Sequence, residues 1–308
     1  MKNFTCSAYR QQGFTLVEII LVMVITGVIG GMVAIFIRAP VQGYVDSGRR
    51  AEMTDVADTA VRRISRDLQL ALPNSVRVTP DGLFLEFIPT TGGGRYRSAD
   101  AGGTGSCTGV VGNTDGDALS FTTADTCFEV IGPMPPLAVG NQVVVNNLGI
   151  PGADAYAGNA LNTHNRRGVV APIGVSSIRL NSVNRLPLDV CQFNPATGTA
   201  RQCRFRVVDR PVTYACDLAT GTLTRYWGYA IQAAQTSTDS IAELDALVAP
   251  FNATRGSALL ASNVSACNFT YNPNAVAQRT GVITMALTIT QQGESVVLFN
   301  ATQVNNAP

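Results

Sequence analysis

The most informative segment of the chain begins Gly13-Phe14-Thr15-Leu16-Val17-Glu18 and continues as an apolar run to Ile37. From Phe14 to Ile37 there are 24 residues, and Glu18 is the only charged one. A helix of that length would reach roughly 36 Å, which is enough to cross a hydrocarbon core of about 30 Å. No small-residue cleavage site of the kind found behind a secretory signal follows Ile37. The segment therefore predicts one membrane-spanning helix.

The residues before Phe14 include Lys2 and Arg10 and no acid. Such positive charge favours retention on the cytoplasmic side, so the rest of the chain is predicted to be periplasmic or external. An acid at the centre of a lipid-embedded helix costs about 2.5 to 3.5 kcal/mol, and less near its end. Glu18 therefore either reaches the interface or meets a cationic partner, and its own residue type does not decide between the two.

The six residues Gly13–Glu18 resemble the class III signal of type IV prepilins and type II secretion pseudopilins. The resemblance implies that a prepilin peptidase cuts after Gly13 and methylates the new N-terminal Phe14. It also implies that Glu18 pairs with the N-terminal amine of a neighbouring subunit. A buried carboxylate and a buried ammonium can neutralise each other in this way only when the subunits stack in register.

Glycines lie within the apolar run, and Gly27 and Gly31 have a small-xxx-small spacing. They either allow close helix packing or merely weaken the helix locally, and the second interpretation is favoured.

Beyond Pro40 the pattern predicts a second helical stretch that extends to about Leu72, where Pro73-Asn74 ends it. Two i,i+4 pairs, Asp58–Arg62 and Arg63–Asp67, are predicted on its exposed side. Its apolar positions recur every three or four residues and predict a buried face made of Met53, Val56, Ala60, Ile64, Leu68 and Ala71.

From Ser75 onward the pattern is one of strands and loops. The clearest alternation, at Val282–Thr290, predicts a hairpin that turns at Gln291-Gln292-Gly293 into Glu294–Phe299. Further strands are predicted at Leu83–Ile88, Leu119–Thr122, Val212–Cys216 and Thr222–Ile231, the last two flanking a hairpin loop at Asp217–Gly221. Long glycine-rich loops are predicted at Thr90–Gly116, Leu148–Arg167 and Gln235–Gly256, with one or two helical turns possible at Ile241–Val248.

Seven cysteines are present, and Cys6 lies in the predicted leader. The other six form an even set beyond the membrane, where an oxidising compartment favours disulfides. Six cysteines allow fifteen pairings, and proximity in sequence favours Cys107–Cys127, Cys191–Cys203 and Cys216–Cys267. A metal site is the alternative, but no C-x-x-C occurs and His164 is the only histidine.

Catalytic motifs find little support in this chain. It contains no G-x-S-x-G, no H-E-x-x-H and no P-loop, and Lys2 is its only lysine. His164 lies in a polar loop and is a weak candidate for the base of a catalytic triad. The formal net charge of +1 indicates no basic face for nucleic acid. We therefore expect neither an enzyme nor a nucleic-acid-binding protein.

Two other groups could bind ligands. Asn113, Asp115 and Asp117 have a spacing that can hold calcium through oxygen ligands, although an Asx turn is the favoured interpretation and no cofactor is expected. Alternation places Trp227 and Tyr229 on one strand face with Leu223, which favours a core role over an exposed sugar-binding platform.

Val61–Val78 is similar to the end of the stalk helix in the J-type minor pseudopilins and in minor pilin-like proteins of mannose-sensitive haemagglutinin (MSHA) pilus biogenesis. Three further segments resemble the MSHA proteins alone, and they are Pro211–Tyr229, Leu259–Tyr271 and Val304–Pro308. The resemblance implies a subunit that joins major and minor pilin-like subunits on an inner-membrane assembly platform and starts or caps a filament. The alternatives are a J-type minor pseudopilin of a type II secretion system and a tip adhesin whose head binds a surface glycan.

The expected fold is α+β, a pilin-like lollipop in which a long N-terminal helix packs on a β-rich, disulfide-containing head. Four parts are expected: a leader at 1–13, a transmembrane and assembly helix at 14–38, an amphipathic stalk helix at 39–72 and a head at 73–308. The expected location is the bacterial inner membrane, which the chain crosses once with its head in the periplasm, before it enters a pilus or pseudopilus.

Overall fold

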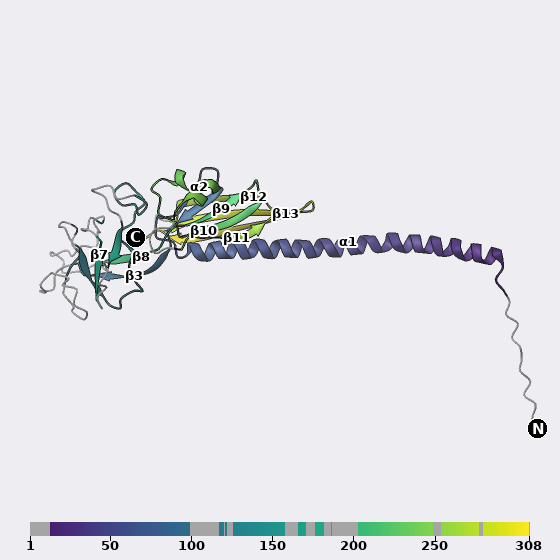
Figure 1. The fold of residues 1–308 in the computed structure, drawn as a ribbon, viewed down its shortest axis with the longest axis horizontal. Coiled ribbons are helices and arrows are strands. Elements are labelled where there is room, and N and C mark those ends of the chain that lie inside the picture. The colour runs from purple at the N-terminus through teal and green to yellow at the C-terminus, as the bar shows by residue number, and fades with distance from the viewer. Residues whose placement is uncertain are drawn as a thin grey trace, which may run out of the picture. The chain divides into compact units, whose positions relative to one another are not determined.

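The computed structural model describes residues 13–98, 117–119, 121, 126–157, 166–170, 176–181, 186, 203–248, 254–276 and 280–307. Their chain order is one long N-terminal helix followed by a β-rich head that contains a disulfide, which makes the fold α+β as predicted (Figure 1). The chain divides into two compact units, Met1–Glu52 and Met53–Pro308. The second unit contains the last turns of the helix and all of the strands.

Helix α1 runs from Leu16 to Leu68 and includes Pro40. The two predicted helical stretches are therefore one element, which ends four residues before the predicted limit at Leu72. Proline lacks an amide hydrogen, so the carbonyl of Phe36 loses its helical donor. Because this carbonyl lies beside Arg38, where the apolar run ends, water can take the place of the missing donor.

The last turns of α1 form part of the main core of the head. The buried helix residues contact side chains from two β-sheets, and they are Met53, Ala57, Ala60, Val61, Ile64 and Leu68. Four of the six predicted positions, Met53, Ala60, Ile64 and Leu68, are buried as expected for an amphipathic helix. The predicted Val56 and Ala71 are only partly buried, and Ala57 and Val61 are buried without having been predicted.

Asp67 lies on the same turns but is not the exposed partner that the sequence predicted. Tyr214 donates a hydrogen bond to its carboxylate over 2.7 Å, and Arg225 donates another over 2.8 Å. Arg63 reaches the other carboxylate oxygen at 3.2 Å. The pair Asp58–Arg62, by contrast, is exposed as predicted. Asp67 thus fixes the helix to a sheet through groups that are distant in sequence.

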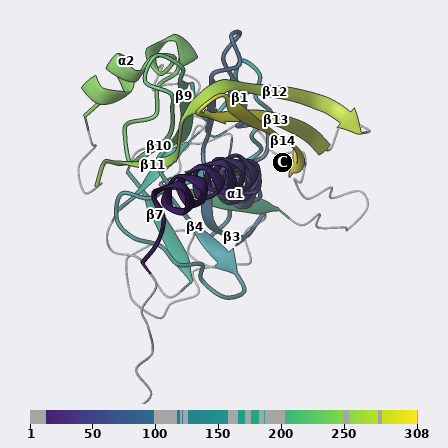
Figure 2. The same cartoon turned by 90° about the vertical axis from the view of Figure 1, so that its right-hand side faces the viewer.

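A five-stranded antiparallel sheet has the order β1-β2-β9-β10-β11. Figure 2, which looks at the end of α1, labels β9, β10 and β11 of this sheet. Its strands are β1 (Arg77–Val78), β2 (Phe84–Phe87), β9 (Val212–Asp217), β10 (Thr222–Trp227) and β11 (Gly256–Ser262). The predicted hairpin around Asp217–Gly221 is confirmed by β9 and β10, although β10 ends at Trp227 and not at the predicted Ile231. Between β10 and β11 lie a short 3-10 helix, Gln235–Ser237, and α2, Ile241–Ala246, the second of which falls within the predicted helical turns.

The C-terminal sheet has three long antiparallel strands, β12 (Val264–Val276), β13 (Thr280–Gln291) and β14 (Glu294–Asn305). Gln292 and Gly293 have φ of 51° and 84°, which is the left-handed geometry of a tight hairpin turn. The predicted inward face of β13 is confirmed, and its buried residues are Ile283, Met285, Leu287 and Ile289.

A closed six-stranded barrel forms the remaining part of the head, with the order β3-β4-β7-β6-β5-β8. Its strands are β3 (Thr90–Tyr96), β4 (Cys127–Ile131), β5 (Gln142–Val144), β6 (Arg167–Val170), β7 (Ser177–Leu180) and β8 (Arg204–Val208). The sequence predicted a loop where β3 lies, so the start of the loop Thr90–Gly116 is wrong. The strand predicted at Leu119–Thr122 is also wrong for its described residues, of which Leu119 packs into the barrel core without strand geometry.

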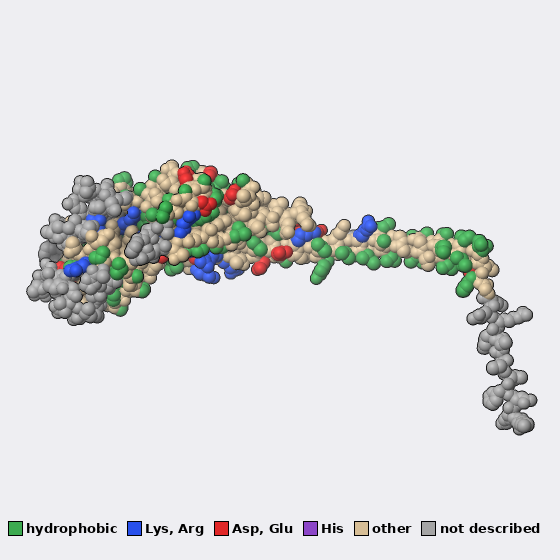
Figure 3. Space-filling view, in the orientation of Figure 1, with side chains coloured by type: hydrophobic (Ala, Val, Ile, Leu, Met, Phe, Trp, Pro, Cys, Tyr) green, Lys and Arg blue, Asp and Glu red, His purple; other side chains and the backbone are tan. Residues whose placement is uncertain are grey.

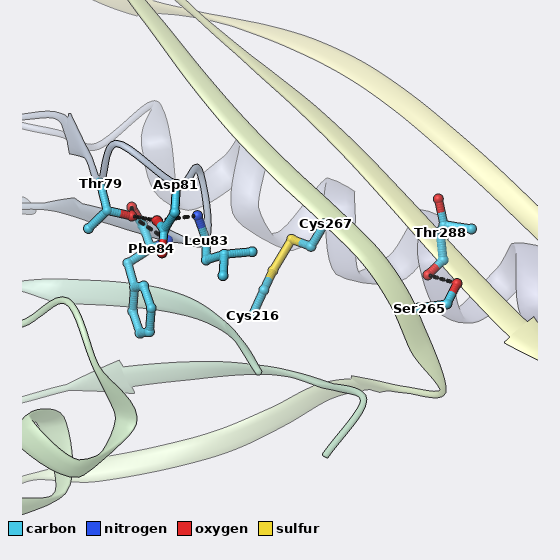
Figure 4. The surroundings of a disulfide bond; sticks show 8 residues. All are labelled: Thr79, Asp81, Leu83, Phe84, Cys216, Ser265, Cys267 and Thr288. Carbon is cyan, nitrogen blue, oxygen red and sulfur yellow. Dashed lines mark hydrogen bonds between the residues drawn. A yellow bond between two sulfur atoms is a disulfide. The ribbon is translucent and has the colours of Figure 1, made fainter. Parts of the chain in front are cut away.

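The disulfide Cys216–Cys267 joins β9 of one sheet to β12 of the other, as predicted (Figure 4). Cys127 and Cys203 are also disulfide-bonded. Their predicted partners, Cys107 and Cys191, lie outside the described residues, so those two pairings stay predictions.

A buried polar network centres on Glu86 of β2, which is fully inaccessible to solvent. Its carboxylate accepts hydrogen bonds from Arg77 at 2.8 Å, from Thr238 at 2.9 Å and from Tyr229 at 3.0 Å. Burial raises the pKa of Glu86 above its ordinary value, although the positive charge of Arg77 acts in the opposite direction. The network ties the segment after β10 to the interior of the sheet.

Candidate assembly and processing segment

The N-terminal end of α1 is capped by its own sequence. Thr15 precedes the first helical residue, and its hydroxyl accepts a hydrogen bond from the backbone N–H of Glu18 over 3.3 Å. Threonine at the cap with glutamate three residues later is the pattern of a capping box. The carboxylate also lies in the first turn, where the helix dipole favours negative charge. We did not assign a role to Thr15 from the sequence, although the T-x-x-E spacing carries that signal.

The predicted processing site lies just before this cap. Gly13 and Phe14 are outside the helix, and Phe14 has 78% of its surface exposed. Nothing in the chain lies within 4 Å of the place where a Cβ on Gly13 would be. No described residue therefore covers the peptide bond between Gly13 and Phe14, and a peptidase could reach it.

An uncharged apolar surface follows Glu18. Large hydrophobic side chains between Ile19 and Ile37 are exposed, and Figure 3 shows hydrophobic side chains along this helix. An 18-residue window of α1 has a mean hydropathy of 2.8, which makes this helix a candidate membrane span. The hydroxyl of Thr26 donates to the carbonyl of Val22 at 2.7 Å, so this polar side chain is satisfied within the helix.

Glu18 has no cation near it on its own helix. The next charged residue along α1 is Arg38, which is twenty positions away and therefore about 30 Å along the axis. After cleavage at Gly13, the amine of Phe14 would be the nearest positive group of the same chain. That amine would lie at a helix N-terminus, where the helix dipole disfavours positive charge.

The glycines of the segment are open to neighbours. At Gly27, Gly30 and Gly31 an added Cβ would meet nothing within 4 Å. Packing within the chain therefore does not require glycine at these positions, and both sequence-based interpretations stay open.

Trp227 ends strand β10 and is half-buried against the main core, which includes the fully buried Leu223. Its ring lies over Gly256 of β11, where an added Cβ would come within 2.4 Å of indole carbon Cζ2. Tyr229 packs in a separate cluster, so the prediction that it shares a face with Trp227 is wrong. The reason is Gly228, whose φ of 80° interrupts the alternation of the strand.

The other candidate ligands are only partly within the described residues. Asp117 is buried, whereas Asn113, Asp115 and His164 lie outside the described part of the chain. Within that part, no three His, Cys, Asp or Glu side chains come together as a metal site would require. The described residues therefore form no arrangement that supports a calcium site or a catalytic site.

Comparison with known proteins gives one match. Residues 9–34 match the family model of the prokaryotic N-terminal methylation motif, a span that includes Gly13, Phe14 and Glu18. No curated protein and no solved structure matches the chain significantly. The motif implies processing by a prepilin peptidase and assembly with other pilin subunits. Together with the exposed apolar helix and the β-rich head that follows it, the match supports a membrane-anchored, type IV pilin-like protein.

Proposed function

We propose that this chain is a minor pilin-like subunit, similar to MshO, that helps to initiate or cap an MSHA-type (type IV) pilus through its N-terminal helix. The observation that carries the proposal is Glu18, a lone carboxylate at the start of an exposed apolar helix. Assembly, rather than catalysis, is the proposed activity, and it needs no cofactor.

The energetics of Glu18 favour a partner. A carboxylate in the first turn gains about 0.3 to 1 kcal/mol from the helix dipole. An acid at the centre of a membrane helix costs about 2.5 to 3.5 kcal/mol, and Glu18 costs less while its first turn stays near the membrane surface. Inside a filament the helix would be surrounded by other helices and water could not reach the acid. An ion pair with the methylated amine of Phe14 on a neighbouring subunit would then compensate for the loss of water around the Glu18 carboxylate.

The proposed sequence of events begins in the bacterial inner membrane. The chain would cross it once, with the head in the periplasm, and a prepilin peptidase would cut after Gly13. The subunit would pair with other pilin-like subunits through Glu18 and be drawn upward by the assembly platform as the filament grows.

Replacing Glu18 with alanine tests this function directly. We expect Glu18→Ala to be cleaved at Gly13 but to be absent from sheared filaments, as measured by immunoblotting and by mass spectrometry of the N-terminus. The matched control is Glu52→Ala, which removes an exposed acid of the same helix beyond the apolar run and should enter filaments normally. Incorporation of Glu18→Ala at the level of the unaltered protein would refute the proposal.

A J-type minor pseudopilin of a type II secretion system is the alternative within this class. Co-purification from native membranes, followed by mass spectrometry, separates the two, because the partners would be pilus subunits in one case and secretion pseudopilins in the other.

A glycan-binding tip head is the second candidate, favoured by a pocket of about 420 Å³ beside Trp227. Arg210, Asp209 and Asn141 also line this pocket and offer hydrogen bonds to sugar hydroxyls. The full-length protein would then bind a glycan array, and Arg210→Gln would reduce binding. An array without any bound glycan would exclude this role.

A further inference from the structure

A second pocket, of about 580 Å³, opens on the outer surface of the barrel. Its walls come from β3 and β8, and among its lining residues are Arg95, Arg204 and Arg206. Among the described residues that line it there is no carboxylate. The proposed assembly function gives this pocket no role.

The strand register brings the three arginines together. Arg95 of β3 is directly opposite Arg204 of β8, and Arg206 follows two positions along β8 on the same face. Directly opposed residues have Cβ atoms about 4.5 to 5.5 Å apart, and alternate residues of a strand are about 7 Å apart. Three positive charges therefore share one small area of the barrel.

Glycine keeps this area open. Gly93 is the residue opposite Arg206, so no side chain from β3 covers the guanidinium there. A Cβ on Gly93 would come within 2.8 Å of the carbonyl oxygen of Phe205, which shows how closely the two strands approach. The pocket floor at this point is backbone rather than side chain.

Arg206 lies close to two residues of like charge. Like charges directly opposite each other destabilise a sheet. Burial, and then the charge of Arg204, lower the pKa of Arg206. In the part of the chain that the structure describes, neither Arg95 nor Arg206 forms an ion pair. A bound anion would reduce the repulsion that acts on Arg206.

We propose that the pocket formed by Arg95, Arg204 and Arg206 binds a phosphate group. Guanidinium groups bind phosphate through paired, charge-assisted hydrogen bonds. A phosphate monoester has three acceptor oxygens and a charge near −2, which suits three neighbouring arginines of one pocket better than a single carboxylate does. The volume exceeds that of one phosphate and leaves room for a sugar that carries it.

Calorimetric titration of the full-length mature protein in an uncharged detergent tests this site. The probes are inorganic phosphate and glucose 6-phosphate, with glucose and matched ionic strength as controls. We expect Arg95→Gln and Arg206→Gln each to weaken binding about tenfold or more, since each removes a charged hydrogen-bond donor. The matched control Arg62→Gln, on the exposed face of α1, should bind as the unaltered protein does.

Each outcome decides the matter. Tighter binding of glucose 6-phosphate than of phosphate assigns the pocket to a phosphorylated saccharide, and equal binding assigns it to the phosphate group alone. If Arg206→Gln fails to fold, the exposed Arg95→Gln decides. The proposal is overturned if the unaltered protein does not bind either probe at about 10 mM, a concentration that corresponds to a binding free energy of about −3 kcal/mol. Binding that survives in both variants also overturns it.

Discussion

Replacing both Cys216 and Cys267 with alanine would remove the covalent link between the two sheets. The strands that carry them keep their own partners, because β9 pairs with β2 and β10, and β12 pairs with β13. We therefore expect the double variant to fold to the same structure with a lower free energy of unfolding.

The size of the loss follows from the loop that the disulfide closes. The two cysteines are 51 residues apart. For a loop of that length the chain-entropy relation gives about 4 kcal/mol at 25 °C. Compactness of the unfolded chain reduces this figure and the lost packing of two buried sulfur atoms increases it, so we expect a loss of about 3 to 5 kcal/mol.

Urea titration in an uncharged detergent would measure this loss, followed by the fluorescence of Trp227. This residue is the only tryptophan of the chain and lies on β10, next to the strand that carries Cys216. The control is Ser265→Ala, an exposed position on β12 near the disulfide (Figure 4), which should change the free energy of unfolding by less than about 0.5 kcal/mol. A loss below about 1 kcal/mol in the double variant would refute the entropic argument.

Three further substitutions test interactions in the head. Asp67→Ala should destabilise it by about 2 to 3 kcal/mol, because Arg225 would keep a largely buried charge without its partner, whereas the exposed Asp58→Ala should have an effect below about 0.5 kcal/mol; equal effects in urea titrations would contradict this. The raised pKa of Glu86 means that its contribution to stability is present below about pH 4.5 and is lost as the pH rises through its folded-state pKa. The stability difference between the unaltered protein and Glu86→Gln should therefore fall with rising pH, and a flat difference would show that the acid is not perturbed. Gly256→Ala would place a methyl group 2.4 Å from the indole ring and should lower the thermal midpoint through a loss of about 1 to 3 kcal/mol; an unchanged midpoint would show that the ring moves freely.

The parts of the fold that the sequence predicted have long, regular patterns. Residues 53–68 repeat apolar side chains over four helical turns, and β13 alternates over twelve residues. Both patterns bury one face, so the period of the sequence is also the period of the core. The position of the hairpin turn was also predictable, because Gln292 and Gly293 interrupt the alternation between the two strands.

The barrel was not predictable in this way because its strands are short. β5 has three residues and β4 has five, which is too few for a period to be distinguished from chance. β3 contains Gly92-Gly93-Gly94, a composition typical of loops. Strand geometry there depends on close contact with β8, which no local pattern reveals.

The candidate site was predictable from local sequence, whereas one ion pair of the head was not. Gly13, Phe14 and Glu18 are adjacent in sequence and carry their signal locally. The pairing of Asp67 with Arg225 joins residues 158 positions apart. Its discovery required the folded chain, since the i,i+4 neighbour Arg63 offered a sufficient local partner.

The grip of the head on the last turns of α1 has a mechanical consequence. In the proposed filament, tension would pull each subunit along its helix, and the last turns of the helix lie in a core to which both sheets contribute. Extraction would have to slide Met53, Ile64 and Leu68 past their contacts all at once, rather than one after another. The covalent bridge between β9 and β12 prevents the two sheets from spreading apart during such a slide. Oxidation of the two thiols to this one disulfide would thus raise the force needed to separate the head from the helix.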